Sequence, residues 1–156
     1  MSTLTRKKFE RQKVMNIEIF TLSKYAEETN GTLSIQGIFD VINAPQLPVV
    51  LPACYLALRF RSTKDDLQNH HFKIRFLDPD GKDIIPIIDA DYRNQTPTQY
   101  DTFTANLALQ MGNCQFKVYG KYSIDLSIDG HSQRTFPLYI NKPNIPNTGQ
   151  AGTAIN

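Results

Sequence analysis

The sequence predicts an all-β domain, an antiparallel β-sandwich of about eight strands in two sheets. Apolar and polar residues alternate with a period of two in several short segments, as expected for strands with one buried face. Turn signals separate these segments, and the clearest are Asn30-Gly31, Asp78-Pro79-Asp80-Gly81 and Asp129-Gly130. No segment has the period of an amphipathic helix longer than a turn or two.

Composition divides the 156 residues into three parts. Residues 1–14 form a basic tail, residues 15–140 the β-sandwich domain, and residues 141–156 a tail rich in Asn, Pro, Gly and Thr. We expect both tails to be disordered, because such segments bury little apolar surface. The basic tail is interpreted as a solvated segment, and a docking arm for an acidic partner is the alternative.

The beginning of the domain holds two predicted strands. Residues 14–23 carry apolar side chains on both faces, so this strand can be covered on each side. Residues 25–30 are interpreted as a polar connection. Residues 32–43 form the second strand, in which Gly37 predicts a bulge or a close backbone approach.

The middle of the chain holds a proline-rich crossing and the clearest single strand. Residues 44–53 contain three prolines, which cannot donate ladder hydrogen bonds, so an extended crossing or an edge is predicted. Residues 55–61 alternate strictly. The predicted inward set is Leu56, Leu58 and Phe60, and the predicted outward set is Tyr55, Ala57, Arg59 and Arg61.

Three further segments complete the middle of the predicted sandwich. Residues 72–76 form a strand with Phe72, Ile74 and Phe76 inward. Residues 83–92 form another, and Pro86 within it predicts an edge position. Residues 102–110 alternate well, and their predicted inward side chains are Phe103, Ala105, Leu107 and Leu109.

The last hairpin, residues 119–140, is the most regular part of the pattern. Its strict alternation predicts that Ile124, Leu126 and Ile128 form the centre of the core. Asp125 and Ser127 are then predicted to face outward.

The charge balance bears on partners and on the compartment. A formal net charge of +2 gives no strong electrostatic steering, so nucleic-acid binding is not expected. No run of about 18 apolar residues is present, so membrane insertion is not expected. The basic N-terminus lacks the apolar stretch of a signal peptide, which favours a cytoplasmic location.

Neither a cofactor nor a metal is expected from the residue pattern. Cys54 and Cys114 match no metal-ligand spacing and are interpreted as reduced, small apolar side chains, with a disulfide as the alternative. Asp78, Asp80 and Asp83 lie in a segment with the residues of a β-turn. A weak cation site at these three carboxylates is the alternative.

Catalytic motifs are missing from the sequence, which has no Gly-x-Ser-x-Gly elbow and no glycine-rich phosphate loop. A small enzyme or ligand-binding protein, with its site in the loops at one end of the sandwich, is nevertheless kept as an alternative. Its candidate groups are His70, His71, Asp89 and Asp91.

The most suggestive surface feature is basic. Four cations are predicted to lie on the outward faces of two strands that we expect to be neighbours, and they are Arg59, Arg61, Lys73 and Arg75. Like charges facing one another across a ladder are destabilising, so another group must offset them. The protein's own acids are the favoured interpretation, and an acidic protein partner and a phosphate backbone are the alternatives.

Two resemblances add to this pattern. The run from Gly120 to Leu126 resembles the penultimate strand of immunoglobulin-like sandwiches, in which a tyrosine corner ties a loop to the sheet. Residues 16–140 resemble a bacterial family of small single-domain proteins of unknown function. The matching motifs are GTLSIQGIFDVI, FLDPDG, GKYSIDLSIDG and PLYI. This second resemblance implies a bacterial, cytoplasmic β-sandwich and no particular reaction.

Together these observations predict a non-enzymatic binding or assembly module that acts through protein–protein contacts. An open edge strand, free to pair with another chain, is the expected means of association, including self-association.

Overall fold

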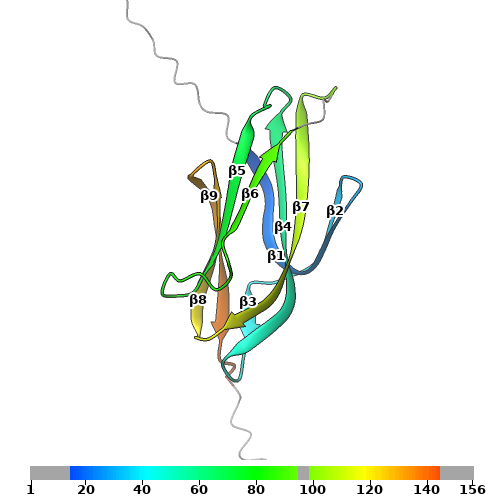
Figure 1. Cartoon of the computed structure of the whole chain (residues 1–156). Coiled ribbons are helices and arrows are strands. Elements are labelled where there is room, and N and C mark those ends of the chain that lie inside the picture. Colours follow the sequence, from blue (N-terminus) through cyan, green and yellow to red (C-terminus); the bar gives the residue numbers. More distant parts are fainter. Residues whose placement is uncertain (1–14, 95–98, 145–156) are drawn as a thin grey trace, which may run out of the picture.

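The computed structural model describes residues 15–94 and 99–144, and within them every regular element is a strand (Figure 1). The strands are β1 (Asn16–Thr29), β2 (Thr32–Ile38), β3 (Val41–Asn43), β4 (Val49–Thr63), β5 (Asn69–Leu77), β6 (Ile88–Arg93), β7 (Thr102–Phe116), β8 (Gly120–Ile128) and β9 (His131–Asn141). No helix in the described part of the chain is long and apolar enough to cross a membrane. The predicted tails at residues 1–14 and, from residue 145 onward, at the C-terminus lie outside the described residues.

The strands form two sheets, with the orders β2-β1-β4-β7 and β3-β9-β8-β5-β6. The all-β, two-sheet prediction is therefore confirmed. The prediction of a plain antiparallel, immunoglobulin-like sandwich is wrong, because β3 pairs with β9 in parallel. The five-stranded sheet is consequently mixed, and it curls into a half-barrel.

The parallel pair arises because the chain crosses from one sheet to the other between β2 and β3. Residues 32–43 were predicted to be one strand, but the segment divides into β2 and β3, which belong to different sheets. The break follows Gly37, which has a φ of 70°. A Cβ atom at this position would lie 3.1 Å from side-chain carbons of Lys24, so the predicted close approach is made by a side chain.

Strand β1 is longer than predicted, because residues 25–29 continue the strand instead of forming a polar connection. Its first half pairs with β4 and its second half with β2. The turn at Asn30-Gly31 has positive φ at both residues, as its sequence predicts. The amide nitrogen of the Asn106 side chain on β7 donates to the carbonyl oxygen of Gly31 at 2.9 Å. The β1–β2 hairpin therefore folds back over the outer face of the four-stranded sheet (Figure 1).

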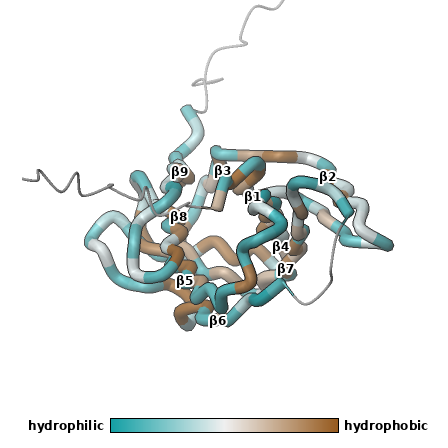
Figure 2. The backbone as a smooth tube through the Cα atoms, turned by 90° about the horizontal axis from the view of Figure 1, so that it is seen from above, coloured by the Kyte–Doolittle hydropathy of each residue, from teal (hydrophilic) through white to brown (hydrophobic). Residues whose placement is uncertain are grey.

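The folded-back hairpin changes the environment of the outer face. Ala57 is on the predicted outward side of β4 yet is completely buried. Ala26 on the hairpin is buried as well, and neither alanine belongs to the main core cluster. Seen from above, hydrophobic stretches lie in both sheets, while the outlying loops are mostly hydrophilic (Figure 2).

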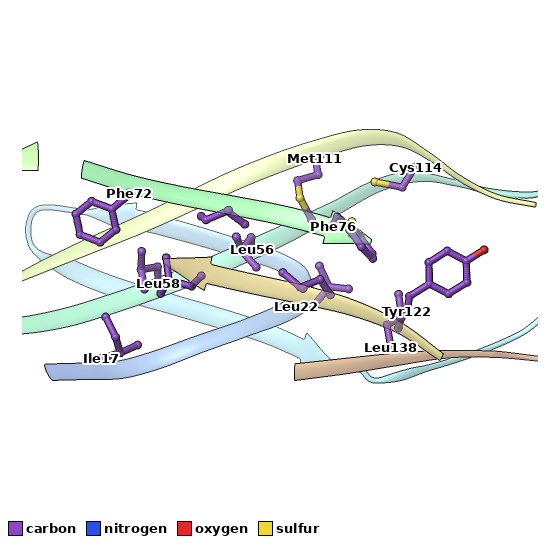
Figure 3. Close-up of a cluster of buried hydrophobic side chains, with 14 of the residues drawn as sticks. Ile17, Leu22, Leu56, Leu58, Phe72, Phe76, Met111, Cys114, Tyr122 and Leu138 are labelled. Atoms are coloured by element: carbon purple, nitrogen blue, oxygen red, sulfur yellow. The ribbon is translucent and has the colours of Figure 1, made fainter. Parts of the chain in front are cut away.

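The core lies between the sheets and follows the predicted pattern (Figure 3). Ile124, Leu126 and Ile128 are buried as predicted, whereas Asp125 and Ser127 are partly exposed on the opposite face of β8. Edge-to-face ring contacts, which add to the burial energy, join Phe76, Phe116 and Tyr122 at one end of the core.

A tyrosine corner closes that end of the molecule. The hydroxyl group of Tyr122 donates to the carbonyl oxygen of Val118 at 2.8 Å, which ties the loop before β8 to the sheet. This is the arrangement that the resemblance to the penultimate strand of immunoglobulin-like sandwiches implies.

Both proline-based edge predictions agree with the pairing. Residues 49–53 of β4 contain Pro52 and pair only with β7, since β1 begins its pairing with β4 at Tyr55. Strand β6, which forms one edge of the five-stranded sheet, begins at Ile88, two residues after Pro86; the predicted strand over residues 83–92 is therefore wrong for residues 83–87.

Candidate functional site

The four cations of the predicted basic face lie on two different sheets. Arg59 and Arg61 are on β4, and Lys73 and Arg75 are on β5. The prediction that these strands are neighbours is wrong, because β4 pairs with β1 and β7 whereas β5 pairs with β8 and β6. Similar alternation on both strands gave no signal about which sheet each would join.

On β4, one acidic side chain offsets both arginines. Glu18 on β1 accepts from the Nε atoms of Arg59 and Arg61 at 2.7 and 2.5 Å. Hydrogen bonds from Arg61 and Arg59 hold the pKa of Glu18 below its usual value. Arg59 also donates to the side-chain oxygen of Asn106, and the side-chain nitrogen of Asn106 donates to Gly31 in the β1–β2 hairpin. Arg59 thus stabilises the fold of the outer face.

On β5, the same kind of pairing recurs. Arg75 and Asp83 form a bidentate ion pair, in which Nε and Nη2 of Arg75 donate to the two carboxylate oxygens of Asp83 at 3.1 and 2.8 Å. Lys73 stands opposite Asp89 on β6 in the strand register. Each sheet thus supplies acids that offset its own cations. Partner binding by these cations stays a prediction.

The carboxylates around Gly81 do not converge. Asp78 accepts from the backbone nitrogens of Asp80 and Lys82 at 2.8 and 2.9 Å, and Gly81 has a φ of 81°. Asp83 points instead to Arg75. These contacts are those of a β-turn, and no group of three or more metal-ligating side chains occurs within residues 15–94 and 99–144.

His70 is a buried residue at the start of β5 and lies between two carboxylates. Its Nδ1 atom is 2.7 Å from Asp129, and its Nε2 atom is 2.9 Å from both oxygens of Asp66. Ser62 donates to Asp66, and the backbone nitrogen of His71 donates to Asp129. Because both ring nitrogens face acceptors, the imidazole is held as the cation.

The electrostatics of this cluster agree with its geometry. Burial lowers the pKa of His70, but the hydrogen bonds and charges of Asp129 and Asp66 outweigh burial and raise it above the usual value. Burial raises the pKa of Asp66, while hydrogen bonds from Ser62 and His70 bring it below the usual value. The cluster joins the end of β4 to the β8–β9 turn, so its role is to hold the two sheets together at this end.

His71 points to the opposite side of β5 and is exposed. Its ring nitrogens contact Asp89 and Asp91 on β6, at 2.8 Å in the case of Asp91. Three of the four candidate groups of the alternative site, His71, Asp89 and Asp91, therefore lie together, with both ring nitrogens in contact with carboxylates. The hollow at the other end of β8 and β9 is lined by Asn43, Tyr119, Gly120, Ile140, Asn141, Lys142, Pro143 and Asn144, which include no histidine and no carboxylate.

A different feature of the structure has the properties of a docking site: the outer edge of β7. In the part of the chain that the structure describes, no strand pairs with this edge, because β7 ends its sheet and bonds only to β4. The strand is 15 residues long and contains no Asp, Glu, Lys, Arg or Pro. Natural sheets usually protect such an edge with charges, prolines, bulges or short length.

The other three edges carry protection of these kinds. Strand β3 has only three residues, and β6 carries Asp89, Asp91 and Arg93. Strand β2 has only seven residues, and the positive φ of Gly37 lies next to its last residue. On β7 the one comparable irregularity, at Asn113, is confined to the far end, so residues 102–111 remain a regular, unprotected edge.

An apolar seam runs beside this edge. The inner-facing side chain of Leu107 is 38% exposed, although Leu58 opposite it on β4 is buried. Ile87, just before β6, is 45% exposed, and Ile88 and Leu109 are only partly buried. The two sheets therefore do not close over their apolar faces on the β6–β7 side.

The sequence contained a signal for this edge, namely a long alternating segment without charge. Residues 102–110 were predicted as a strand. Of its predicted inward side chains, Phe103, Ala105 and Leu109 pack against the core, whereas Leu107 is exposed. Alternation alone does not distinguish an edge strand from a central one.

Comparison with known protein families gives one result for this fold. A model of a family of unknown function, DUF6941, matches residues 18–141. The chain belongs to the DUF6941 family. The predicted resemblance to a family of unknown function is thereby confirmed, over nearly the same residues. No curated protein matches the chain.

Proposed function

We propose that this DUF6941 protein is a non-enzymatic assembly module that associates with a second copy of itself through the edge of β7. The observation that carries the proposal is a 15-residue edge strand without a charge or a proline. Such an edge offers a row of backbone donors and acceptors to an incoming strand. Two edges pairing in this way would form one continuous sheet of eight strands across both copies, twice the four of one copy.

A second copy fits this edge better than a charged partner. In a two-fold pairing, each side chain near the axis meets its own equivalent, so any charge there would face a like charge. Strand β7 carries none. An antiparallel pair centred on Leu107 would place Ala105 opposite Leu109 of the second copy. The exposed side of the apolar seam would then be covered.

Sedimentation equilibrium over a wide range of protein concentration tests this proposal. We expect the wild-type protein to form a dimer and Leu107→Lys to shift the equilibrium toward the monomer by at least tenfold in Kd, because a lysine pair would face across the axis. Ile38→Lys is the matched control, since Ile38 is a more exposed aliphatic residue on the β2 edge.

Urea unfolding of both variants checks that each is folded. A wild-type protein that stays monomeric at all concentrations would overturn the proposal. So would a dimer that only Ile38→Lys dissociates, because the contact would then lie on the opposite edge of the sheet.

A further inference from the structure

The turn between β1 and β2 contains the only Asn-Gly pair of the chain, Asn30-Gly31. Both residues are exposed, and a Cβ atom at Gly31 would meet nothing within 4 Å. An asparagine followed by glycine can form a cyclic imide, because the nitrogen of a residue without a side chain approaches the preceding amide without steric hindrance. The turn is therefore open to water and carries the residue pair best suited to this reaction.

The reaction is a deamidation that consumes only water. In the first step the backbone nitrogen of Gly31 bonds to the side-chain carbonyl carbon of Asn30. The side-chain NH2 group leaves and takes the proton of that nitrogen with it as ammonia. In the second step water adds to one carbonyl carbon of the imide, breaks its bond to the Gly31 nitrogen and returns a proton to that nitrogen. Opening at the side-chain carbon gives aspartate, whereas opening at the main-chain carbon gives isoaspartate, which adds a methylene group to the main chain.

The folded hairpin holds both peptide groups of Gly31 out of the reactive arrangement. The amide nitrogen of Gly31 donates to Oε1 of Glu28 at 2.8 Å, and the side-chain nitrogen of Asn106 on β7 donates to the carbonyl oxygen of Gly31 at 2.9 Å. The imide ring closes only if the peptide group before Gly31 rotates and its nitrogen loses the proton. The bond to Glu28 opposes both changes, because a carboxylate stabilises the proton of its donor.

The two products of deamidation differ in how they fit this turn. Asn30 and Gly31 have φ values of 51° and 79°, a conformation that Asp-Gly adopts as readily as Asn-Gly. Aspartate at this position therefore keeps the hairpin. Isoaspartate does not fit, because the two-residue loop joins Thr29 and Thr32, which are paired in the register, and the longer main chain displaces the carbonyl oxygen that Asn106 holds.

We propose that Asn30 is a deamidation site that Glu28 and Asn106 keep closed in the folded hairpin, and that its isoaspartyl product releases the hairpin from the outer face of the four-stranded sheet. Deamidation then proceeds through local opening of the hairpin, which costs less free energy than unfolding the whole domain. Because the isoaspartyl bond does not revert to asparagine, the release is permanent. This inference is independent of the proposed pairing of β7 edges.

Peptide mapping by mass spectrometry, during storage at mildly alkaline pH, measures the rate of deamidation at Asn30. We expect the native wild-type protein to react about tenfold more slowly, or slower still, than the same chain unfolded in urea. Glu28→Ala and Asn106→Ala should each raise the native rate about fivefold, which corresponds to the loss of one exposed hydrogen bond. Glu27→Ala, beside Glu28, and Leu126→Ala, which weakens the core away from the hairpin, are the controls and should react like the wild-type protein.

Two results of this experiment would overturn the proposed closure. One is a native wild-type protein that reacts as fast as the unfolded chain. The other is a rate in Glu28→Ala or Asn106→Ala that does not exceed the rate in Leu126→Ala, because the reaction would then depend on global unfolding. Circular dichroism shows whether each variant is folded before the rates are compared.

Amide hydrogen exchange tests the proposed release. Ion exchange separates the deamidated fraction of aged wild-type protein from unreacted protein by its added charge. In this fraction we expect a fast-exchanging population of the hairpin, residues 24–38, equal in size to the isoaspartyl share found by peptide mapping. Asn30→Asp carries the same added charge without the longer main chain, so its hairpin should exchange like that of the wild-type protein. A deamidated fraction that exchanges throughout like Asn30→Asp would contradict the release.

Discussion

The Nδ1 atom of His70 lies 2.7 Å from Oδ2 of Asp129 and thereby fastens the β8–β9 turn to the start of β5. Asp129 itself has a positive φ of 52° and supplies the turn that its Asp-Gly sequence predicts. One aspartate therefore forms the hairpin turn and holds a buried cation. Asp66 holds the same imidazole from the other side. The stability of this end of the sandwich should consequently depend on pH.

The direction in which stability changes with pH follows from the pKa shifts of the histidine and of the two aspartates. The pKa of His70 is raised in the folded state. Its contribution to the free energy of unfolding is therefore fully present below the unfolded pKa of about 6.5, and it is lost as pH rises through the folded pKa. The pKa values of Asp66 and Asp129 are lowered, so their contribution is present above about 3.9 and is lost as pH falls through the folded values.

We predict that His70→Ala lowers the free energy of unfolding by about 3 kcal/mol in the window between these limits, because two carboxylates lose their shared cation. The difference from the wild-type protein should shrink as the pH is raised through the folded pKa of His70. Urea unfolding at several pH values measures it. His71→Ala is the matched control and should cost much less, because His71 and its aspartates are exposed. Equal losses for both variants would contradict the assigned role of His70.

Leu126 and Asp125 test the register of β8. Leu126 is completely buried, so Leu126→Ala should cost about 2–5 kcal/mol through lost burial and the remaining cavity. Asp125→Ala should cost well under about 1 kcal/mol, since one of its carboxylate oxygens is buried without a hydrogen-bond partner. Urea unfolding of the two variants compares the two losses. A larger loss for Asp125→Ala would mean that the two faces of the strand are assigned the wrong way round.

The tyrosine corner predicts a hydroxyl effect. Tyr122→Phe keeps the ring in the core but leaves the Val118 carbonyl oxygen without its 2.8 Å donor. We expect a loss of about 1–2 kcal/mol in the free energy of unfolding. Tyr139→Phe is the control, because Tyr139 is more exposed, and this substitution should be nearly neutral. A neutral Tyr122→Phe would show that the corner adds nothing to stability.

Asn106 should control the mobility of the β1–β2 hairpin. Asn106→Ala removes the donor to the Gly31 carbonyl oxygen and the acceptor for Arg59. We predict faster amide hydrogen exchange in the hairpin, residues 24–38, with exchange in the β8–β9 hairpin unchanged. Gln110→Ala, on the same strand and exposed, should leave both regions as they are. Unchanged exchange in the β1–β2 hairpin of Asn106→Ala would mean that other contacts hold it down.

Much of the fold could be predicted because burial imposes a period of two. The inward side chains of β4, β5 and β8, for example Leu58, Ile74 and Leu126, were assigned correctly for this reason. Turn residues such as Asn30-Gly31 were also informative, because few residue pairs tolerate their backbone conformation.

The arrangement of strands could not be predicted in the same way, because alternation carries no information about the partner strand. Arg59 and Arg75 have equivalent patterns around them, yet they lie on different sheets. The burial of Ala57 depends on a hairpin that folds over it from a distant segment. The pairing of His70 with Asp129 was equally hidden, since it joins residues far apart in the chain.

The free edge of β7 is the central claim, and amide hydrogen exchange measured at low and high protein concentration tests it most directly. If two copies pair through this edge, amides of residues 102–111 that are unpaired in the monomer should exchange more slowly at high concentration, while those of β2 (Thr32–Ile38) stay unchanged. Exchange along β7 that does not depend on concentration, or protection that arises on β2 instead, would contradict the account.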